Sequence, residues 1–357
     1  MKKIAALLYI FAFIFISCEE DVDYKDLGVK NFIVVNARFI DGEAPKCQVS
    51  RSDIIFDQIP NKVTPTIFLP KANVVANDGN SDFKYVVVSD SAKMEAQGVT
   101  TKAGETYSLK VSADGFDDVY STVTVPSKLK ASIKFINLET EKEDLFWDPF
   151  EDPVLRNRYR ANYEINIQDD PNTEDYYQLL IYTNTKSYEY DFREVDTFYT
   201  YWEDGQLIKV PERYMIPYVV DSSMAYEECY FGSDDPVMNW NQTQSNNLLE
   251  ESDWNSMNIF NDQLFNGQTA KIRFYIYLNN DGITHGADFS YPVYYELRHI
   301  TKEMYMYYRT YQKVSESDWT GSLSPYMLYC NVENGAGLVA AWSAVKDTLQ
   351  RPVIPKD

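Results

Sequence analysis

Histidine, cysteine and basic charge are scarce in this chain of 357 residues, and each scarcity removes a class of function. His285 and His299 are the only histidines, and no Cys or His cluster has the spacing of metal ligands, so a zinc enzyme is not expected. Lys and Arg total 33 against 54 Asp and Glu, which gives a net charge of -21. Because contacts to phosphates need clustered cations, nucleic acid is not an expected partner.

Catalytic motifs are missing as well. The sequence has no Gly-x-Ser-x-Gly elbow, no Gly-rich phosphate loop and no Cys-His constellation. Asp170, Asn172 and Glu174 alternate like the start of a calcium loop, but Asp175 and Ile181 stand where that loop needs Gly and Glu. We therefore expect no catalytic residue, no cofactor and no metal site. A carboxylate-based glycan hydrolase stays open as an alternative, because so many acidic residues can supply a facing pair anywhere.

The apolar run at the start, residues 4–16, is too short to span a membrane, which takes roughly 20 residues. Lys2 and Lys3 precede it, and Ser17 and Cys18 follow it. This order is typical of a signal peptide covering residues 1–17. The residues Phe15-Ile16-Ser17-Cys18 look like a bacterial lipobox, which predicts that the Cys18 thiol takes a diacylglycerol and that palmitate-type acyl chains anchor the protein to a membrane.

A short acidic tether, residues 18–30, follows the lipobox and contains Glu19, Glu20, Asp21 and Asp23. Acidic residues just behind a lipidated cysteine resemble the signal that exports lipoproteins of Bacteroidota to the outer face of the outer membrane. We therefore expect an outer-membrane protein, lipid-anchored and facing the cell exterior.

Aromatic residues are abundant, with 29 Tyr and 19 Phe, and favour β structure. Between residues 31 and 127, apolar runs alternate with Asp-Gly turn pairs. The runs at 32–39, 73–77 and 106–111 each end near such a pair, and a further run at 119–125 stops at Pro126. Short strands with regular turn signals predict an immunoglobulin-like β-sandwich over residues 31–127.

A second, larger unit is expected over residues 128–352. Residues 159–167 alternate apolar and polar side chains, which predicts a half-buried antiparallel strand, and residues 176–182, 270–278 and 292–300 read similarly. Thr301 is placed to cap a helix over 301–314. Its stripe of Met304, Tyr308 and Tyr311 indicates packing against a sheet. The predicted fold class is mainly β: the N-terminal sandwich, then an antiparallel β-rich domain with one helix.

Three cysteines follow Cys18, and an odd number allows at most one intramolecular disulfide. Cys229 and Cys330 are the candidate pair, while buried free thiols, Cys47 included, are an equally good interpretation.

The stretch from 182 to 240 combines aromatic and acidic residues with few strong strand patterns, so we expect long loops there. Aromatic side chains in loops offer rigid contact area to a glycan, peptide or protein ligand. The alternative is that they fill the core of the sheet. The candidate binding residues are Tyr188, Tyr190, Tyr199, Tyr201, Trp202 and Trp240.

Several segments together resemble a lipoprotein family of Bacteroidota known as domain of unknown function 4249. They are Ile33-Val34-Val35-Asn36, Cys47-Gln48-Val49-Ser50-Arg51-Ser52, Gly104-Glu105-Thr106-Tyr107 and Asn331-Val332-Glu333-Asn334-Gly335-Ala336-Gly337-Leu338. The resemblance implies a surface lipoprotein without an assigned activity, often encoded near TonB-dependent outer-membrane receptors. By analogy it implies an accessory role in nutrient uptake.

The sequence thus predicts a non-catalytic binding or accessory partner of a TonB-dependent receptor. Two alternatives remain: a carboxylate-based glycan hydrolase, favoured by a cleft with two facing carboxylates, and a structural or adhesive envelope protein, favoured by a flat exposed aromatic patch.

Overall fold

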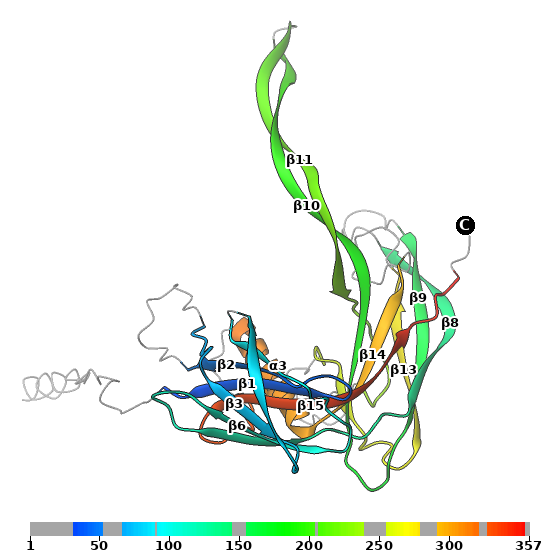
Figure 1. The fold of residues 1–357 in the computed structure, drawn as a ribbon. Coiled ribbons are helices and arrows are strands. Elements are labelled where there is room, and N and C mark those ends of the chain that lie inside the picture. Colours follow the sequence, from blue (N-terminus) through cyan, green and yellow to red (C-terminus); the bar gives the residue numbers. More distant parts are fainter. Residues whose placement is uncertain are drawn as a thin grey trace, which may run out of the picture.

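The computed structural model describes residues 31–52, 66–89, 91–144, 155–203, 206–238, 255–278, 291–320 and 327–353. Over these ranges the chain is mainly β, as predicted, with strands β1 to β15 and the helix α3 (Lys302–Thr320). Figure 1 shows a sandwich built from the N-terminal strands, a second layered unit beside it, and a long two-stranded ribbon that projects away from both.

The N-terminal sandwich has two layers joined by a strand that bends from one to the other. One layer comprises β1 (Ile33–Ile40), β2 (Lys46–Arg51) and β5 (Lys93–Ala96). The other comprises β3 (Asn73–Asn77), β6 (Thr106–Ser112) and β7 (Val119–Thr124). β4 (Asp82–Ser89) pairs with β3 through its first residues and with β5 through its last ones. The side chains of β6 alternate, and Tyr107, Leu109 and Val111 all lie in the core between the layers.

The second unit packs a three-stranded sheet against a part of the larger one. The small sheet comprises β8 (Ala131–Asp144), β9 (Leu155–Gln168) and β13 (Thr269–Tyr277). The facing strands are β10 (Tyr176–Glu203), β12 (Ile259–Asn261) and β14 (Val293–Ile300). Tyr163 of β9 stacks on Phe274 of β13 with ring centroids 5.4 Å apart, and both belong to one core with Leu179 and Leu297. The alternation predicted for 159–167 is confirmed, because its apolar side is this core.

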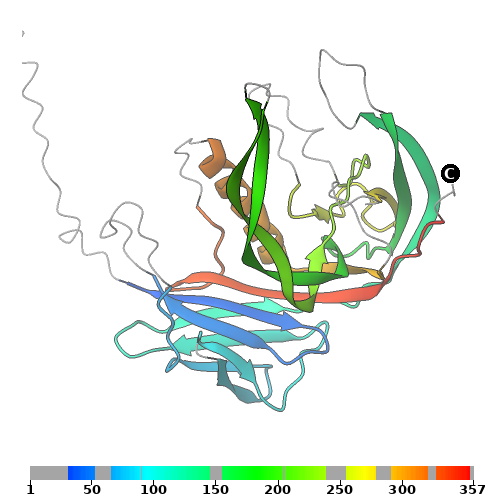
Figure 2. The same ribbon diagram turned by 90° about the horizontal axis from the view of Figure 1, so that it is seen from above.

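The C-terminal strand β15 (Ala336–Thr348) joins the two units. It pairs in parallel with β1 and antiparallel with β14, so among the described strands the large sheet runs in the order β11-β10-β14-β15-β1-β2-β5-β4-β3-β6-β7. The predicted sandwich ends at residue 127, but one hydrogen-bonded sheet includes strands from both sides of that boundary. Figure 2, seen from above, shows β15 as the long strand that runs from the sandwich to the second unit.

The helix α3 begins where the sequence predicts it. The N–H of Met304 donates to Thr301 Oγ1 at 3.3 Å, so Thr301 is the N-cap. The helix ends at Thr320, beyond the predicted 314. Met304 is buried and Tyr308 packs against the same cluster, which includes Trp342 of β15, whereas Tyr311 is 43% exposed. The predicted packing stripe is therefore correct for two of its three residues.

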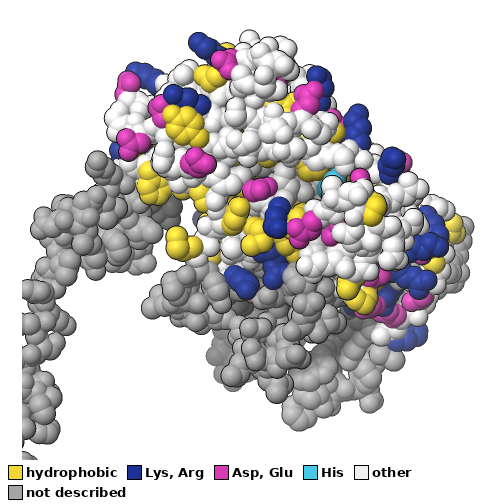
Figure 3. All heavy atoms as spheres, turned by 90° about the horizontal axis from the view of Figure 1, so that it is seen from below, with side chains coloured by type: hydrophobic (Ala, Val, Ile, Leu, Met, Phe, Trp, Pro, Cys, Tyr) yellow, Lys and Arg dark blue, Asp and Glu magenta, His cyan; other side chains and the backbone are white. Residues whose placement is uncertain are grey.

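The surface seen from below mixes acidic and basic side chains with hydrophobic ones (Figure 3). Interspersed charge of both signs is what a solvated face of a globular protein carries. In the part of the chain that the structure describes, no helix combines the length and the apolar character needed to cross a bilayer.

Candidate functional site

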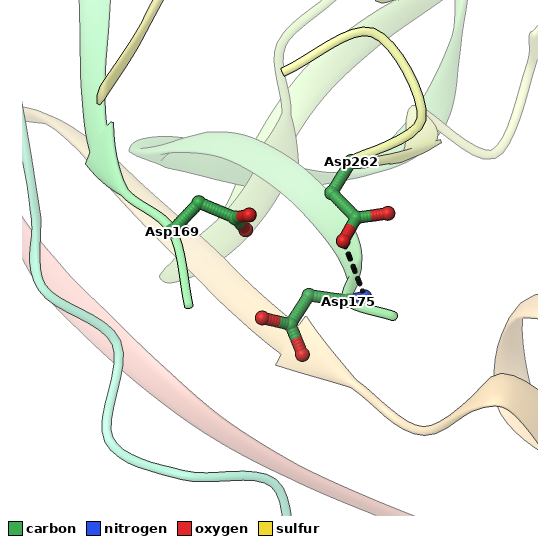
Figure 4. Close-up of side chains that lie close together, drawn as sticks. All are labelled: Asp169, Asp175 and Asp262. Carbon is green, nitrogen blue, oxygen red and sulfur yellow. Dashed lines mark hydrogen bonds between the residues drawn. The ribbon is translucent and has the colours of Figure 1, made fainter. Parts of the chain in front are cut away.

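Three aspartates meet where the connection between β9 and β10 touches the connection between β12 and β13. Asp169 directly follows β9, Asp175 directly precedes β10, and Asp262 directly follows β12. One carboxylate oxygen from each lies within 4.8 Å of the others (Figure 4). Strand ends thus bring Asp262 beside two aspartates that are far from it in the sequence.

The aspartates are hydrogen-bonded in ways that fix the loops around them. The N–H of Asp175 donates to Asp262 Oδ2 at 3.0 Å, and the N–H of Asp262 donates to the Asp175 carbonyl at 3.1 Å. Asp169 accepts from the Tyr177 hydroxyl at 2.7 Å and from the N–H of Gly267 at 2.8 Å. The carboxylates of Asp169 and Asp262 therefore already have hydrogen-bond partners, and the cluster ties two connections together.

His299, on β14, lies against Asp175. Its Nδ1 is 3.0 Å from the carbonyl oxygen of Ser127, and its Nε2 is 3.1 Å from Asp175 Oδ1. Both partners accept hydrogen bonds, and a neutral imidazole has only one N–H. His299 therefore bridges the Ser127 carbonyl and the Asp175 carboxylate, and its tautomer decides which ring nitrogen donates. The ring also stacks on Tyr177 with centroids 5.4 Å apart, so its position is fixed by packing as well as by polar contacts.

Negative charge dominates this buried cluster. Asp175 is 7% exposed and Asp262 only 1%, and His299 is the single basic side chain hydrogen-bonded to the three carboxylates among the described residues. Burial, together with the nearby Asp169 and Asp175, raises the pKa of Asp262. Burial and the hydrogen bond to Asp169 raise the pKa of Tyr177.

Oxygen ligands of this kind suit a hard cation such as Ca²⁺ better than zinc. At 1% exposure, however, Asp262 is out of reach of a glycan. The arrangement favours a structural role, in which the hydrogen-bonded carboxylates hold two loops together, over a hydrolytic pair of carboxylates.

A second feature is the ribbon formed by residues 184–203 of β10 and 206–226 of β11 (Gln206–Glu228), which we call the arm. Its register runs from Asn184 opposite Tyr226 to Glu203 opposite Gln206. At about 3.3 Å per residue the arm contains roughly 65 Å of paired strand. It projects from the body in Figure 1, and β11 pairs with no described strand other than β10.

Most of the described side chains of the arm are solvent-exposed, and Ile208 is of intermediate burial. Glu194, Thr200, Lys209, Val210 and Arg213 are all exposed, and Arg213 forms an ion pair with Glu194 at 3.1 Å. Apolar residues recur at alternate positions of the register: Val195 opposite Tyr214, Tyr199 opposite Val210, and Tyr201 opposite Ile208. The arm thus carries apolar residues among charged ones on a ribbon that projects from the body (Figure 1).

The family profile titled Domain of unknown function (DUF4249) matches residues 19–348. The chain belongs to this family. No curated protein and no solved structure matches it. Membership in DUF4249 confirms the family part of the resemblance drawn from the sequence, and it carries no assigned activity. Its match includes the arm and the carboxylate cluster alike.

The structure describes only some of the candidate residues of the DUF4249 chain. Cys18 and Trp240 lie outside the described residues, as do the signal peptide and the tether. The backbone of the other candidate aromatics lies on β10 within the arm: Tyr188, Tyr190, Tyr199, Tyr201 and Trp202. The expectation of long loops from 182 onward was wrong, because β10 and β11 fill 176–228 except for the two residues at their junction.

The predicted disulfide is also wrong. Cys229 and Cys330 are both free thiols. Cys229 is buried in the core of the second unit, whereas Cys330 is exposed and lies near Val332, which packs in the N-terminal sandwich. The two cysteines therefore belong to different parts of the fold. Burial raises the pKa of Cys229 to about 12, as expected for an inert core thiol.

Sequence reasoning pointed to the aromatic residues of the arm but not to its ribbon structure, and it missed the carboxylate cluster. Asp204-Gly205 lies between the paired Glu203 and Gln206, and Asp-Gly is a strong hairpin signal. The carboxylate cluster had no comparable signal. Asp169 reads as part of a turn before Pro171, and nothing in the sequence links it to Asp262.

Proposed function

We propose that this chain is a lipid-anchored protein on the outer face of the outer membrane that serves, without catalysis of its own, as an accessory partner of a TonB-dependent nutrient receptor. The observation that carries the proposal is the arm. In this proposal the arm is the docking element, and the lipidated Cys18 holds the body at the membrane.

A ribbon of this length is hard to explain without a partner. An isolated two-stranded hairpin is marginally stable in water, and independent stability takes a third strand or a packed face. The arm has neither among the described elements. Val210, an exposed apolar residue of the arm, would gain stability if another surface covered it. A large membrane protein close to the tether is a surface of adequate size.

The free edge of β11 argues against simple strand addition as the mode of binding. Pro211 and Pro217 both lie in β11, and proline has no N–H to donate. Prolines on an edge strand are a known protection against pairing with other chains. We therefore expect the partner to contact a face of the ribbon through side chains.

The test compares the full lipidated protein with a variant that has a shortened arm. In that variant, Asn-Gly replaces residues 189–221, joining the opposed Tyr188 and Ser222 through a two-residue turn. Both tagged proteins are recovered from their own outer membrane in mild detergent, and bound proteins are identified by mass spectrometry.

We expect a stoichiometric TonB-dependent receptor with the full protein and none with the shortened one, while the melting temperature of the purified body stays unchanged. Recovery of the full protein alone would overturn the proposal and favour the adhesive or glycan-directed alternatives. Retention of the receptor by the shortened variant would overturn the role of the arm.

A further inference from the structure

A second site lies on the body, at the corner between α3 and the sandwich. A cavity of about 520 Å³ opens over the outer face of β1, β2 and β5, beside the helix. The side chains of these strands alternate between the sandwich core and the floor of the cavity. Ala37, Cys47 and Met94 are buried in the core, and the residues that alternate with them face the cavity. These outward residues are Asn36, Arg38, Lys46, Gln48, Lys93 and Glu95. Tyr307 and Tyr308 of α3, with Leu338 of β15, form the wall.

The floor is positively charged in a strongly acidic chain. Arg38, Lys46 and Lys93 face a single acid, Glu95. Arg38 lies directly opposite Lys46 in the register of β1 and β2, an arrangement of like charges that normally destabilises a sheet. Lys46 has a long ion pair with Glu43 at 3.6 Å. Arg38 and Lys93 form no ion pair with any residue that the structure describes.

Polar and aromatic groups complete the cavity. Gln48 donates its amide N–H to the Ser91 carbonyl at 2.9 Å, which fixes that side chain. On the wall, the ring of Tyr307 stacks on that of Tyr311 with centroids 6.2 Å apart and planes 18° apart. Tyr307 is half-buried, so its ring is held in place beside an open space. Fixed aromatic rings give sugars and other flat apolar faces a contact surface.

We propose that this cavity binds an acidic sugar, a ring of monosaccharide size that carries a carboxylate. The Arg38 guanidinium accommodates the carboxylate in a paired hydrogen bond, and Lys93 adds a second positive charge. The amides of Asn36 and Gln48 meet ring hydroxyls, and Tyr307 lies against the apolar face of the ring. A cavity of this volume is in the normal range for small-molecule sites. The site is separate from the arm and does not depend on the receptor proposal.

The test measures binding of galacturonic acid to the purified chain by calorimetry, with galactose as the neutral match and sodium sulfate as a simple anion. Arg38→Gln and Lys93→Gln each remove one cavity charge. Lys84→Gln is the control, because Lys84 is an exposed lysine of β4 outside the cavity and loses the same charge. Melting temperatures are recorded for all variants to confirm folding.

We expect galacturonic acid to bind, and either cavity substitution to weaken it by about tenfold or more, the effect of losing one charge-assisted contact. Lys84→Gln should bind like the parent, and galactose should bind at least about tenfold more weakly than galacturonic acid. The proposal is overturned if galacturonic acid does not bind up to millimolar concentration, or if Lys84→Gln weakens binding as much as Arg38→Gln. Equal binding of galactose, or of sulfate, would overturn the assignment to an acidic sugar.

Discussion

At the scale of single residues, the carboxylate cluster makes stability depend on pH in an unusual direction. Burial and two neighbouring aspartates raise the pKa of Asp262, so the native state holds this proton more tightly than the unfolded chain does. Stability from this group is therefore present at low pH and is lost as pH rises from the ordinary aspartate pKa of about 3.9 through the native value. Most carboxylates in folded proteins act the other way.

Asp262→Asn tests this dependence, because its amide oxygen can still accept from the N–H of Asp175. Urea unfolding between pH 4 and 7 should show that the variant gains stability relative to the parent as pH rises.

Asp78→Asn is the matched control. Backbone N–H groups of Asn80 and Ser81 lower the pKa of Asp78, so the Asp78→Asn variant should lose stability relative to the parent as pH rises over the same range. If the two variants shift in the same direction, the account of the cluster is incorrect.

At the scale of elements, the parallel pair of β1 and β15 depends on glycine. Gly337 has a φ of +113°, and a Cβ placed there would collide with the backbone oxygen of Val35 on β1. Gly337→Ala should lower the free energy of unfolding by about 2 to 3 kcal/mol or more, since backbone strain and a steric collision act together. Thermal or urea unfolding measures the change.

Gly79→Ala separates the two causes in that experiment. Gly79 also has a positive φ, +90°, but nothing lies within 4 Å of its Cβ position. It should cost only about 1 kcal/mol, the price of the backbone conformation alone. An equal loss of unfolding free energy at Gly79 and Gly337 would mean that the collision with the Val35 backbone adds nothing, and that the close approach of β15 to β1 does not require glycine.

Strands and the helix could be predicted wherever periodicity and end signals coincide. The alternation in 159–167 located β9 to within a few residues, and the Thr301 cap located the start of α3 but not its end at Thr320. The ribbon structure of the arm was missed because prolines interrupt the strand pattern of β11. Non-local features were beyond the sequence: no local pattern tells that β15 pairs with β1, about 300 residues away.

At the scale of the whole molecule, one sheet links a compact sandwich, a second layered unit and an arm that leaves both (Figures 1 and 2). The C-terminal strand closes this arrangement, so the two units should unfold together and not as independent domains. A rigid body is useful to a docking arm, because the arm then meets its partner in a defined orientation. The basic cavity beside α3 is on the body and leaves the arm free.

Photocross-linking in living cells tests the central claim most directly. A photoreactive residue replaces Val210, which is 39% exposed near the end of the arm, and in a second protein it replaces Lys84 on the body. The account predicts that the Val210 probe forms a cross-link to a TonB-dependent receptor and that the Lys84 probe does not. Cross-links to the receptor from Lys84 alone, or none from Val210, would contradict it.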